Sequence, residues 1–323
     1  WSGYGGPTNP KGMNIHYRKK TPSGWEPREM VTSTNYRQEY PEIVVDSQDN
    51  IHIVWHGTGW GANTSHYNIQ YRKRTASGWQ VQESITDKSV DQKRPKIAVD
   101  SQGNVHVVWL GKGWGNNSGY NQIVYRKRTA DGWQDYELIT DIADWQGEPQ
   151  IAVDFDDNIH VVWHGYGWGS NSGYLQIIYR EKTSFGWKDY ELITDKSSHQ
   201  HRPSIGVGAD GTLYVVWEGA GWGSNTDYDI QLAKKAPFSP TWQREEITDR
   251  GLQYYPTILW HFYPKKEGVF WQIPKKGGVF ILWMDYRNHL KIYMSENLIY
   301  GKVVSEPTTQ ISKEFTYYPS SGF

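Results

Sequence analysis

The sequence predicts an all-β fold, a six-bladed β-propeller of four-stranded antiparallel blades, and three repeated features indicate it. The first is a tryptophan series at a 54-residue spacing: Trp1, Trp55, Trp109, Trp163 and Trp217, followed by Trp283. The second series keeps the same spacing: Trp25, Trp79, Trp133 and Trp187, with Trp242 one residue late. The third is a Gly-x-Gly-Trp-Gly-x-Asn motif that recurs in four units. A period of this length without helical spacing is typical of propeller blades.

One unit of the repeat is expected to form four strands. Residues 95–100 are apolar, β-branched and led by a proline, which suits the innermost strand. A tight turn at 101–104 leads to the second strand at 105–109. The Gly-Trp-Gly loop precedes a third strand at 122–128, and the outermost strand covers 133–140. Because the strands alternate in direction, the Gly-Trp-Gly loops and the connections between blades are expected at the same end.

The repeat runs from end to end, so a single domain is expected over residues 1–323. Its repeat units are 1–54, 55–108, 109–162, 163–216, 217–282 and 283–323. Residues 318–323 align with the start of an innermost strand, so we expect the ring to close by pairing the N- and C-terminal strands. Few residues follow Pro319, and the sequence leaves two explanations open: a trimmed chain end, or a strand donated by a neighbouring subunit and hence self-association.

Composition narrows the possible partners. The net charge is −1 and no basic stripe is present, so no nucleic acid is expected. The longest apolar run, 279–284, is too short to span a bilayer, so no membrane insertion is expected. Cysteine is absent, and no metal or cofactor motif is evident, so neither is expected. Aromatic- and glycine-rich repeats that begin at Trp1 rather than Met favour a secreted or cell-surface protein with a leader removed.

Two stretches carry a family resemblance. Residues 95–109 and 149–163 share the pattern Pro-x-Ile-Ala-Val-Asp, then Asn-x-His-Val-Val-Trp. This pattern resembles the secreted bacterial propellers of the sialidase-like, BNR-type group, and the Gly-x-Gly-Trp loops are similar to those of six-bladed fucose-binding lectins. The Asp-box and Phe-Arg-Ile-Pro sequences of true sialidases are absent. The resemblance therefore implies a glycan-related propeller without implying sialidase activity.

The preferred hypothesis is a multivalent, lectin-like glycan-binding protein without catalytic activity. A tryptophan between glycines, with a nearby amide and a second aromatic ring, suits a pyranose, and stacking adds about 0.5–1.5 kcal/mol per site. Several weak sites on one molecule would together bind a multivalent glycan with higher avidity than one site alone. The candidate ligand-binding residues are Trp60, Asn63, Trp114, Asn117, Tyr120, Trp168, Asn171, Tyr174, Trp222, Asn225 and Tyr228. The alternative is that these tryptophans only fill space between blades, as the two spaced tryptophan series and His52, His106 and His160 are expected to do.

An enzyme hypothesis competes with it. A propeller active site lies at the axis and must be asymmetric, so equivalent positions should differ there. Two sets of equivalent positions do differ in residue type between the repeat units. One is the residue before the proline of the innermost strand, and the other is the residue after the tryptophan of the second strand. The resulting candidates are Arg94, Glu148, Arg202, His56, His164 and Glu218, with His199 and His201 nearby. Two arginines could hold a carboxylated sugar and a carboxylate with a histidine could transfer protons, as in a sialidase-like hydrolase or a polysaccharide lyase. A third hypothesis is a self-assembling surface subunit.

Overall fold

The computed structural model describes residues 1–4, 12–208, 210–222, 227–248, 253–259, 280–285 and 291–295. Within these ranges the regular structure consists of antiparallel β-sheets that follow one another along the chain. No helix capable of crossing a membrane occurs in the part of the chain that the structure describes.

The first three sheets come from residues before 139. The first contains β1 (Ser2–Tyr4), β2 (Met13–Tyr17) and β5 (Glu29–Met30), beside a hairpin of β3 (Lys20–Thr21) and β4 (Gly24–Trp25). The second contains β6 (Gln38–Val45), β7 (Ile51–Gly57), β8 (Asn68–Thr75), β9 (Gly78–Trp79) and β10 (Glu83–Ser84). The third contains β11 (Gln92–Val99), β12 (Val105–Gly111), β13 (Gln122–Thr129) and β14 (Gly132–Leu138).

Three more sheets complete the described chain. The fourth contains β15 (Gln146–Val153), β16 (Ile159–Gly165), β17 (Gln176–Thr183), β18 (Gly186–Trp187) and β19 (Glu191–Leu192). The fifth contains β20 (Gln200–Val207), β21 (Leu213–Gly219), β22 (Asp229–Lys235) and β23 (Gln243–Glu246). The sixth contains β24 (Gln253–Leu259), β25 (Phe280–Asp285) and β26 (Lys291–Ser295).

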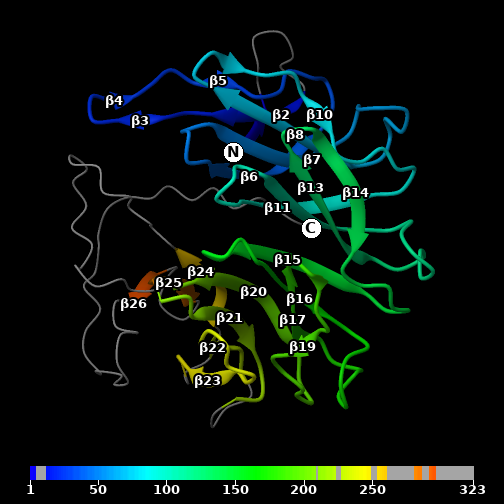
Figure 1. The fold of residues 1–323 in the computed structure, drawn as a ribbon, viewed down its shortest axis with the longest axis vertical. Helices are drawn as coiled ribbons and strands as arrows, with labels where there is room; N and C mark the ends of the chain where they lie inside the picture. The colour runs from blue at the N-terminus through cyan, green and yellow to red at the C-terminus, as the bar shows by residue number, and fades with distance from the viewer. Residues whose placement is uncertain are drawn as a thin grey trace.

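The sheets are arranged around their first long strands. Strands β6, β11, β15, β20 and β24 contact one another in that order. Figure 1 shows β11, β15 and β20 near the middle of the molecule and β14, β19 and β23 toward its periphery. This radial, all-β arrangement confirms the predicted propeller. The number of blades and the closure of the ring stay predictions, because residues 318–323 lie outside the described ranges.

The innermost strands begin earlier than the sequence predicts. Strand β11 starts at Gln92, and Pro95 does not head it. A β-bulge lies between Lys93 and Lys96, and Arg94 within it has a φ of 52°. The residue before the proline is left-handed in every innermost strand that the structure describes: Tyr40, Arg94, Glu148, Arg202 and Tyr255. A left-handed non-glycine backbone is strained, and a bulge redirects its side chain.

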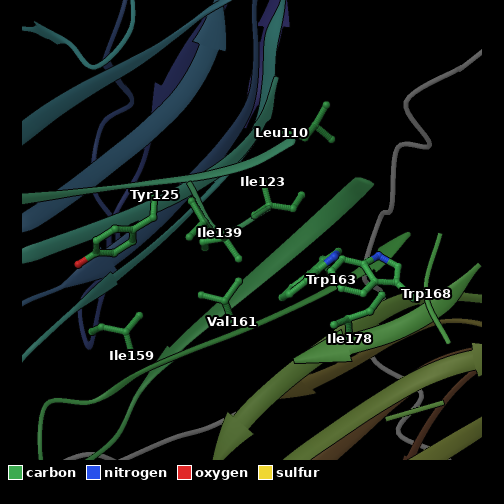
Figure 2. Close-up of a cluster of buried hydrophobic side chains, with 10 residues drawn as sticks. Leu110, Ile123, Tyr125, Ile139, Ile159, Val161, Trp163, Trp168 and Ile178 are labelled. Atoms are coloured by element: carbon green, nitrogen blue, oxygen red, sulfur yellow. The ribbon is translucent and has the colours of Figure 1, made fainter. Parts of the chain in front are cut away.

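The hydrophobic core lies between consecutive sheets. Figure 2 shows one such cluster, which combines Leu110, Ile123 and Tyr125 from the third sheet with Val161 and Trp163 from the fourth. Trp55, Trp109, Trp163 and Trp217 are fully buried, as predicted for their series. Trp1 and Trp25 are exposed, so the prediction that both series lie in the core is wrong at the first sheet. In the other sheets the second series is partly buried and packs against the core: Trp79, Trp133, Trp187 and Trp242. The side chain of Trp283 lies outside the described residues.

A repeated polar contact joins each of the second to fifth sheets to the preceding one, and we call it the inter-sheet clamp. Trp133 donates its indole N–H to Glu83 Oε2 at 2.7 Å, and Arg128 Nε reaches the same oxygen at 2.9 Å. The ring of Trp133 also packs edge-on against Tyr71, with ring centroids 5.3 Å apart. The same contact recurs as Trp79–Glu29, Trp187–Glu137 and Trp242–Glu191. The second tryptophan series therefore holds neighbouring sheets together.

Candidate functional site

The Gly-Trp-Gly tryptophans point into the protein. Trp114 is 5% exposed and Trp168 is 6% exposed. The indole of Trp114 donates to Gln92 Oε1 at 2.6 Å, and the strand tryptophan Trp109 donates to the same oxygen at 3.0 Å. Tyr136 and Lys88 cover the ring of Trp114, at 4.4 and 4.0 Å from its centroid. The same paired bonds join Trp60 to Gln38, Trp168 to Gln146 and Trp222 to Gln200.

The asparagines of these loops are also engaged. Asn117 donates its backbone N–H to Asp141 Oδ1 at 2.8 Å and its side-chain amide to the same oxygen at 3.1 Å. Asn63 binds Asp87 and Asn171 binds Asp195 in the same way. The pKa of each of these aspartates is lowered, first by the backbone N–H of the residue before the asparagine and then by the N–H groups of the asparagine itself; the preceding residues are Ala62, Asn116 and Ser170. Each of these loops is thus bonded to the connection that leads to the next sheet. The loops and the connections therefore lie at the same end of the molecule, as the alternation of strand direction predicts.

These contacts correct the proposed sugar-stacking loops. A buried ring whose N–H is already bonded offers no face to a pyranose, so Trp114 and Trp168 have packing roles. Trp60 and Trp222 are partly buried and share the glutamine contact. Tyr120 and Tyr174 are exposed, and Asn225 lies outside the described residues. Glycine flanks and a nearby amide are needed equally for tight packing and for sugar binding, so the motif could not separate the two.

Tyr228 differs from the tyrosines with which its spacing grouped it. Gly111 pairs with Gln122 and Gly219 with Asp229, so the fifth loop is one residue shorter. This register makes Tyr228, just before Asp229, the equivalent of Tyr67, which precedes Asn68 in the second sheet. Tyr228 therefore lies next to the innermost strand, whereas Tyr120 and Tyr174 lie on the loops.

The left-handed bulge residues form a continuous line across five strands, which we call the axial line. Arg94 forms an ion pair with Glu148 on the next strand. Arg202 Nε lies 3.9 Å from the other oxygen of Glu148. The guanidinium of Arg94 stacks 5.5 Å from the ring of Tyr40, and that of Arg202 stacks 4.3 Å from the ring of Tyr255. The structure therefore brings Arg94, Glu148 and Arg202 together.

A second layer supports this line from below. His56 Nδ1 accepts the backbone N–H of Arg94 at 3.2 Å, and His164 Nδ1 accepts that of Arg202 at 3.0 Å. Burial lowers the pKa of His56 to about 3 and holds that of His164 well below its usual range. Both imidazoles are therefore neutral acceptors that position the bulges. Their predicted acid–base role is corrected to a positioning role.

Glu218 belongs to this supporting layer. Its side chain is 1% exposed, whereas that of Glu148 is 22% exposed. One oxygen of Glu218 lies 2.5 Å from Arg202 Nη1, and the other accepts the backbone N–H of Tyr255 at 2.7 Å. Burial raises the pKa of Glu218, and the Arg202 guanidinium opposes that shift. With both oxygens engaged, Glu218 holds Arg202 in place rather than facing a substrate.

A histidine–tyrosine pair borders the axial line. His201 Nε2 lies 3.3 Å from the hydroxyl of Tyr228. Burial, with help from Arg202 and His199, lowers the pKa of His201 to about 4, so its imidazole is neutral near pH 7. Burial also raises the pKa of Tyr228, which keeps its hydroxyl protonated. A neutral imidazole hydrogen-bonded to a phenol can accept one proton and donate another.

The equivalent pair in the second sheet has different chemistry. Tyr67 donates its hydroxyl to Glu39 Oε2 at 2.9 Å. Sequence reasoning missed Tyr67 and Glu39, and it assigned Tyr228 to sugar stacking. Counting positions from the strand that follows the loop, rather than from the loop tryptophan, would have aligned both pairs. Among the described residues, no cluster of three or more histidine, aspartate or glutamate side chains could hold a metal ion.

Comparisons with known proteins agree on the fold. No protein-family model matches the sequence, and no curated protein matches it either. A protein of unknown function from Dyadobacter fermentans matches over 81% of this chain and 79% of its own, with 12% identity and a TM-score of 0.55. An α-L-arabinofuranosidase of Fusarium graminearum, solved with arabinobiose, matches over 78% and 79%, with 12% identity and a TM-score of 0.54.

A third structure is a polysaccharide lyase, an ulvan lyase bound to a fragment of glucuronate and sulfated rhamnose. It matches over 80% of this chain and 67% of its own, with 12% identity and a TM-score of 0.50. At these identities the likeness establishes the propeller fold alone. The sequence-based preference for a non-catalytic protein is corrected, because the structures that share this fold include an α-L-arabinofuranosidase, an α-L-arabinanase and a polysaccharide lyase, so the fold does not favour a non-catalytic protein.

Proposed function

We propose that this chain is a carbohydrate-active enzyme that cleaves a uronate-containing polysaccharide at the axial line by β-elimination. The observation that carries the proposal is the neutral His201, hydrogen-bonded to Tyr228 and adjacent to Arg202. The ulvan lyase with a related fold binds a glucuronate-containing fragment, which supports the substrate class. Polymers of this kind are extracellular, so a secreted or cell-surface location fits the proposal.

The residues have distinct roles in this mechanism. Arg94 and Arg202 pair with the uronate carboxylate, and this neutralisation makes the C5 proton more acidic. His201 removes that proton. The C5–H electrons form the C4–C5 double bond as the C4–O4 bond breaks, and the Tyr228 hydroxyl gives its proton to the leaving oxygen. An anionic substrate beside His201 raises its pKa toward neutrality, where a general base is most effective.

Glu148 keeps the two arginines in position. It contacts both guanidinium groups, and each guanidinium has five N–H donors, so donors remain for a substrate carboxylate. Arg94 is the more accessible of the two, with 44% of its side chain exposed. A substrate carboxylate approaching the axis therefore meets Arg94 first.

A hydrolase is the second candidate, since the α-L-arabinofuranosidase shares the fold. Most glycoside hydrolases need two carboxyl groups that both face the scissile bond. Glu148 could supply one, but both oxygens of the buried Glu218 are engaged. The geometry therefore supports elimination better than hydrolysis.

The test is to incubate the protein with a panel of uronate-containing polysaccharides and to follow the ultraviolet absorbance of unsaturated uronate. We expect Tyr228→Phe to lower turnover by roughly 10²-fold or more, because it removes the general acid. Arg94→Ala should raise the KM for substrate. Tyr120→Phe is the matched control, because Tyr120 is an exposed loop tyrosine, and it should leave turnover unchanged.

Two results would contradict the proposal. One is the absence of cleavage across the whole panel by the intact protein. The other is cleavage that yields new reducing ends without the unsaturated product, which would favour hydrolysis instead.

A further inference from the structure

We propose a second binding site, for neutral saccharides, at the end of the molecule opposite the axial line. A cavity of about 680 Å³ lies between the fourth and fifth sheets, lined by the turns that join β15 to β16 and β20 to β21. Glu148 and Arg202 lie near the start of β15 and β20, and these turns follow the ends of the same strands. The volume is within the range of about 300–1,000 Å³ that small-molecule sites occupy.

The cavity lies where a repeated structural feature changes. In the third sheet, buried His106 bridges Asp100 and Tyr125, at 3.1 Å from the carboxylate and 2.7 Å from the hydroxyl. Lys127 Nζ lies 3.7 Å from Asp100 and covers it, so that this carboxylate is 3% exposed. The second sheet repeats the arrangement with Asp46, His52, Tyr71 and Lys73.

The fourth sheet keeps the histidine and loses the covering lysine. Glu181 takes the lysine position, since it faces His160 in the register where Lys127 faces His106. Glu181 turns to Lys188, 2.9 Å away, and Asp154 is 17% exposed. In the fifth sheet the histidine position holds Tyr214 and the tyrosine position holds Leu232. The space that the repeat fills elsewhere is therefore open between these two sheets.

Two phenylalanines form the lips of the cavity. Phe155, on the turn after β15, is 58% exposed, and Phe238, on the turn after β22, is fully exposed. The positions equivalent to Phe155 are Ser47 and Ser101. Phe238 also has a φ of 62°, which is strained for a bulky side chain. Neither solvent exposure nor local backbone geometry favours phenylalanine at position 238, whereas a flat ring at a cavity mouth suits a ligand that stacks.

The charge of the lining identifies the ligand class. Five carboxylates and two lysines line the cavity: Asp154, Asp156, Glu181, Glu191 and Asp210, with Lys188 and Lys235. Lys188 pairs with Glu181 and Lys235 pairs with Glu191, which leaves an acidic surplus. Carboxylates accept hydrogen bonds from sugar hydroxyls and repel carboxylated or sulfated rings. The site therefore selects uncharged saccharides, the opposite of the axial line.

The experiment is calorimetric titration of the full chain with neutral oligosaccharides of gluco, manno, galacto and arabino configuration. We expect one of these series to bind, and we expect matched uronate-containing oligosaccharides not to bind at this cavity. Phe238→Ala should weaken binding by about 2–10-fold, the loss of one stacking contact. Glu181→Lys, which restores the lysine of the repeat over Asp154, should remove binding while thermal unfolding stays unchanged.

Matched controls separate this cavity from other surfaces. Phe185→Ala changes a fully exposed phenylalanine of the neighbouring β17–β18 turn that does not line the cavity, and it should leave binding unchanged. Arg94→Ala should also leave it unchanged, so the result is independent of cleavage at the axial line. The proposal is overturned if no neutral series binds, if only amino sugars bind, or if Phe238→Ala and Glu181→Lys bind as well as the unaltered protein.

Discussion

Arg94 combines a functional side chain with an unfavourable backbone. Its φ of 52° lies in the left-handed region, where a Cβ atom is crowded, and it precedes a proline, which narrows its conformational range further. His56 accepts its backbone N–H and Glu148 pairs with its guanidinium, so contacts from two other strands hold it in place. Such strain costs about 1–3 kcal/mol and persists where surrounding structure determines it.

This strain can be measured by comparing two substitutions at one position. Both Arg94→Gly and Arg94→Ala remove the guanidinium, but only glycine adopts a positive φ without crowding. We expect Arg94→Gly to be more stable than Arg94→Ala by about 1 kcal/mol in urea unfolding. The same pair of substitutions at Lys96, two residues along β11 and without a positive φ, should give the opposite order. Equal stability of the two Arg94 variants would show that the bulge is unstrained.

At the scale of one element, a single glutamine links the start of an innermost strand to two tryptophans. Gln92 Oε1 accepts from Trp109 and Trp114, and its amide donates to the carbonyl of Lys112 at 2.9 Å. The Gly-Trp-Gly loop is therefore fixed to the first residue of β11, the innermost strand of the same sheet. An added Cβ at Gly111 would lie 1.9 Å from Gln92 Oε1, which explains why glycine occupies that position.

We expect Gln92→Leu to destabilise the protein by about 2–4 kcal/mol, because two buried indole N–H groups would lose their acceptor. Urea unfolding followed by tryptophan fluorescence measures this change. Gln102→Leu, in the exposed turn between β11 and β12, is the matched control and should change stability by less than about 0.5 kcal/mol. A loss at Gln92 no larger than at Gln102 would argue against the shared acceptor.

The sequence predicted the strands well because hydrophobic alternation and tight turns are local signals. It placed 105–109 and 122–128 on strands, and β12 and β13 contain them. It missed the bulge at Arg94, since a proline is compatible with either the head of a strand or a bulge. It also misassigned the loop tryptophans, because their partner Gln92 lies 22 residues from Trp114 and nothing local connects the two.

The axial candidates were predicted because equivalent positions of the repeat differ in residue type. The structure adds which of these side chains contact one another and which are buried. Equivalent positions that differ in residue type indicated Arg94, Glu148 and Arg202, and these three side chains lie in contact. Burial separates them from His56, His164 and Glu218, which lie one layer deeper. Depth from the surface depends on how neighbouring sheets pack, so a single sequence does not show it.

Across the whole molecule, neutral histidines around the axis make stability depend on pH; His56 is buried and His201 is partly buried. Burial lowers the pKa of His56 to about 3 and that of His201 to about 4, whereas both have a pKa near 6.5 in the unfolded chain. Below about pH 6.5 the unfolded state therefore binds protons that the folded state does not. The stabilisation is complete above the unfolded pKa and is lost as pH falls toward the folded values.

We expect the free energy of unfolding to fall steadily between about pH 6.5 and pH 4. Chemical denaturation across this range measures the slope. His56→Gln and His201→Gln should each make the slope shallower, because each removes one group that gains a proton on unfolding. A slope that neither substitution alters would mean that other groups dominate the acid sensitivity.

The inter-sheet clamp has a consequence for how such a molecule arises. At the four junctions between the first and fifth sheets, one sheet presents a glutamate and the sheet that follows presents a tryptophan with a cation, as in Glu83 with Trp133 and Arg128. Lysine replaces arginine in Lys182 and Lys235 without loss of the contact. A duplicated 54-residue segment would therefore already carry both the glutamate and the tryptophan–cation pair that its contacts with neighbouring sheets require. Because the junction contacts are the same in these sheets, residue differences at the axis, as among Arg94, Glu148 and Arg202 at one position of the repeat, leave the joints between sheets intact.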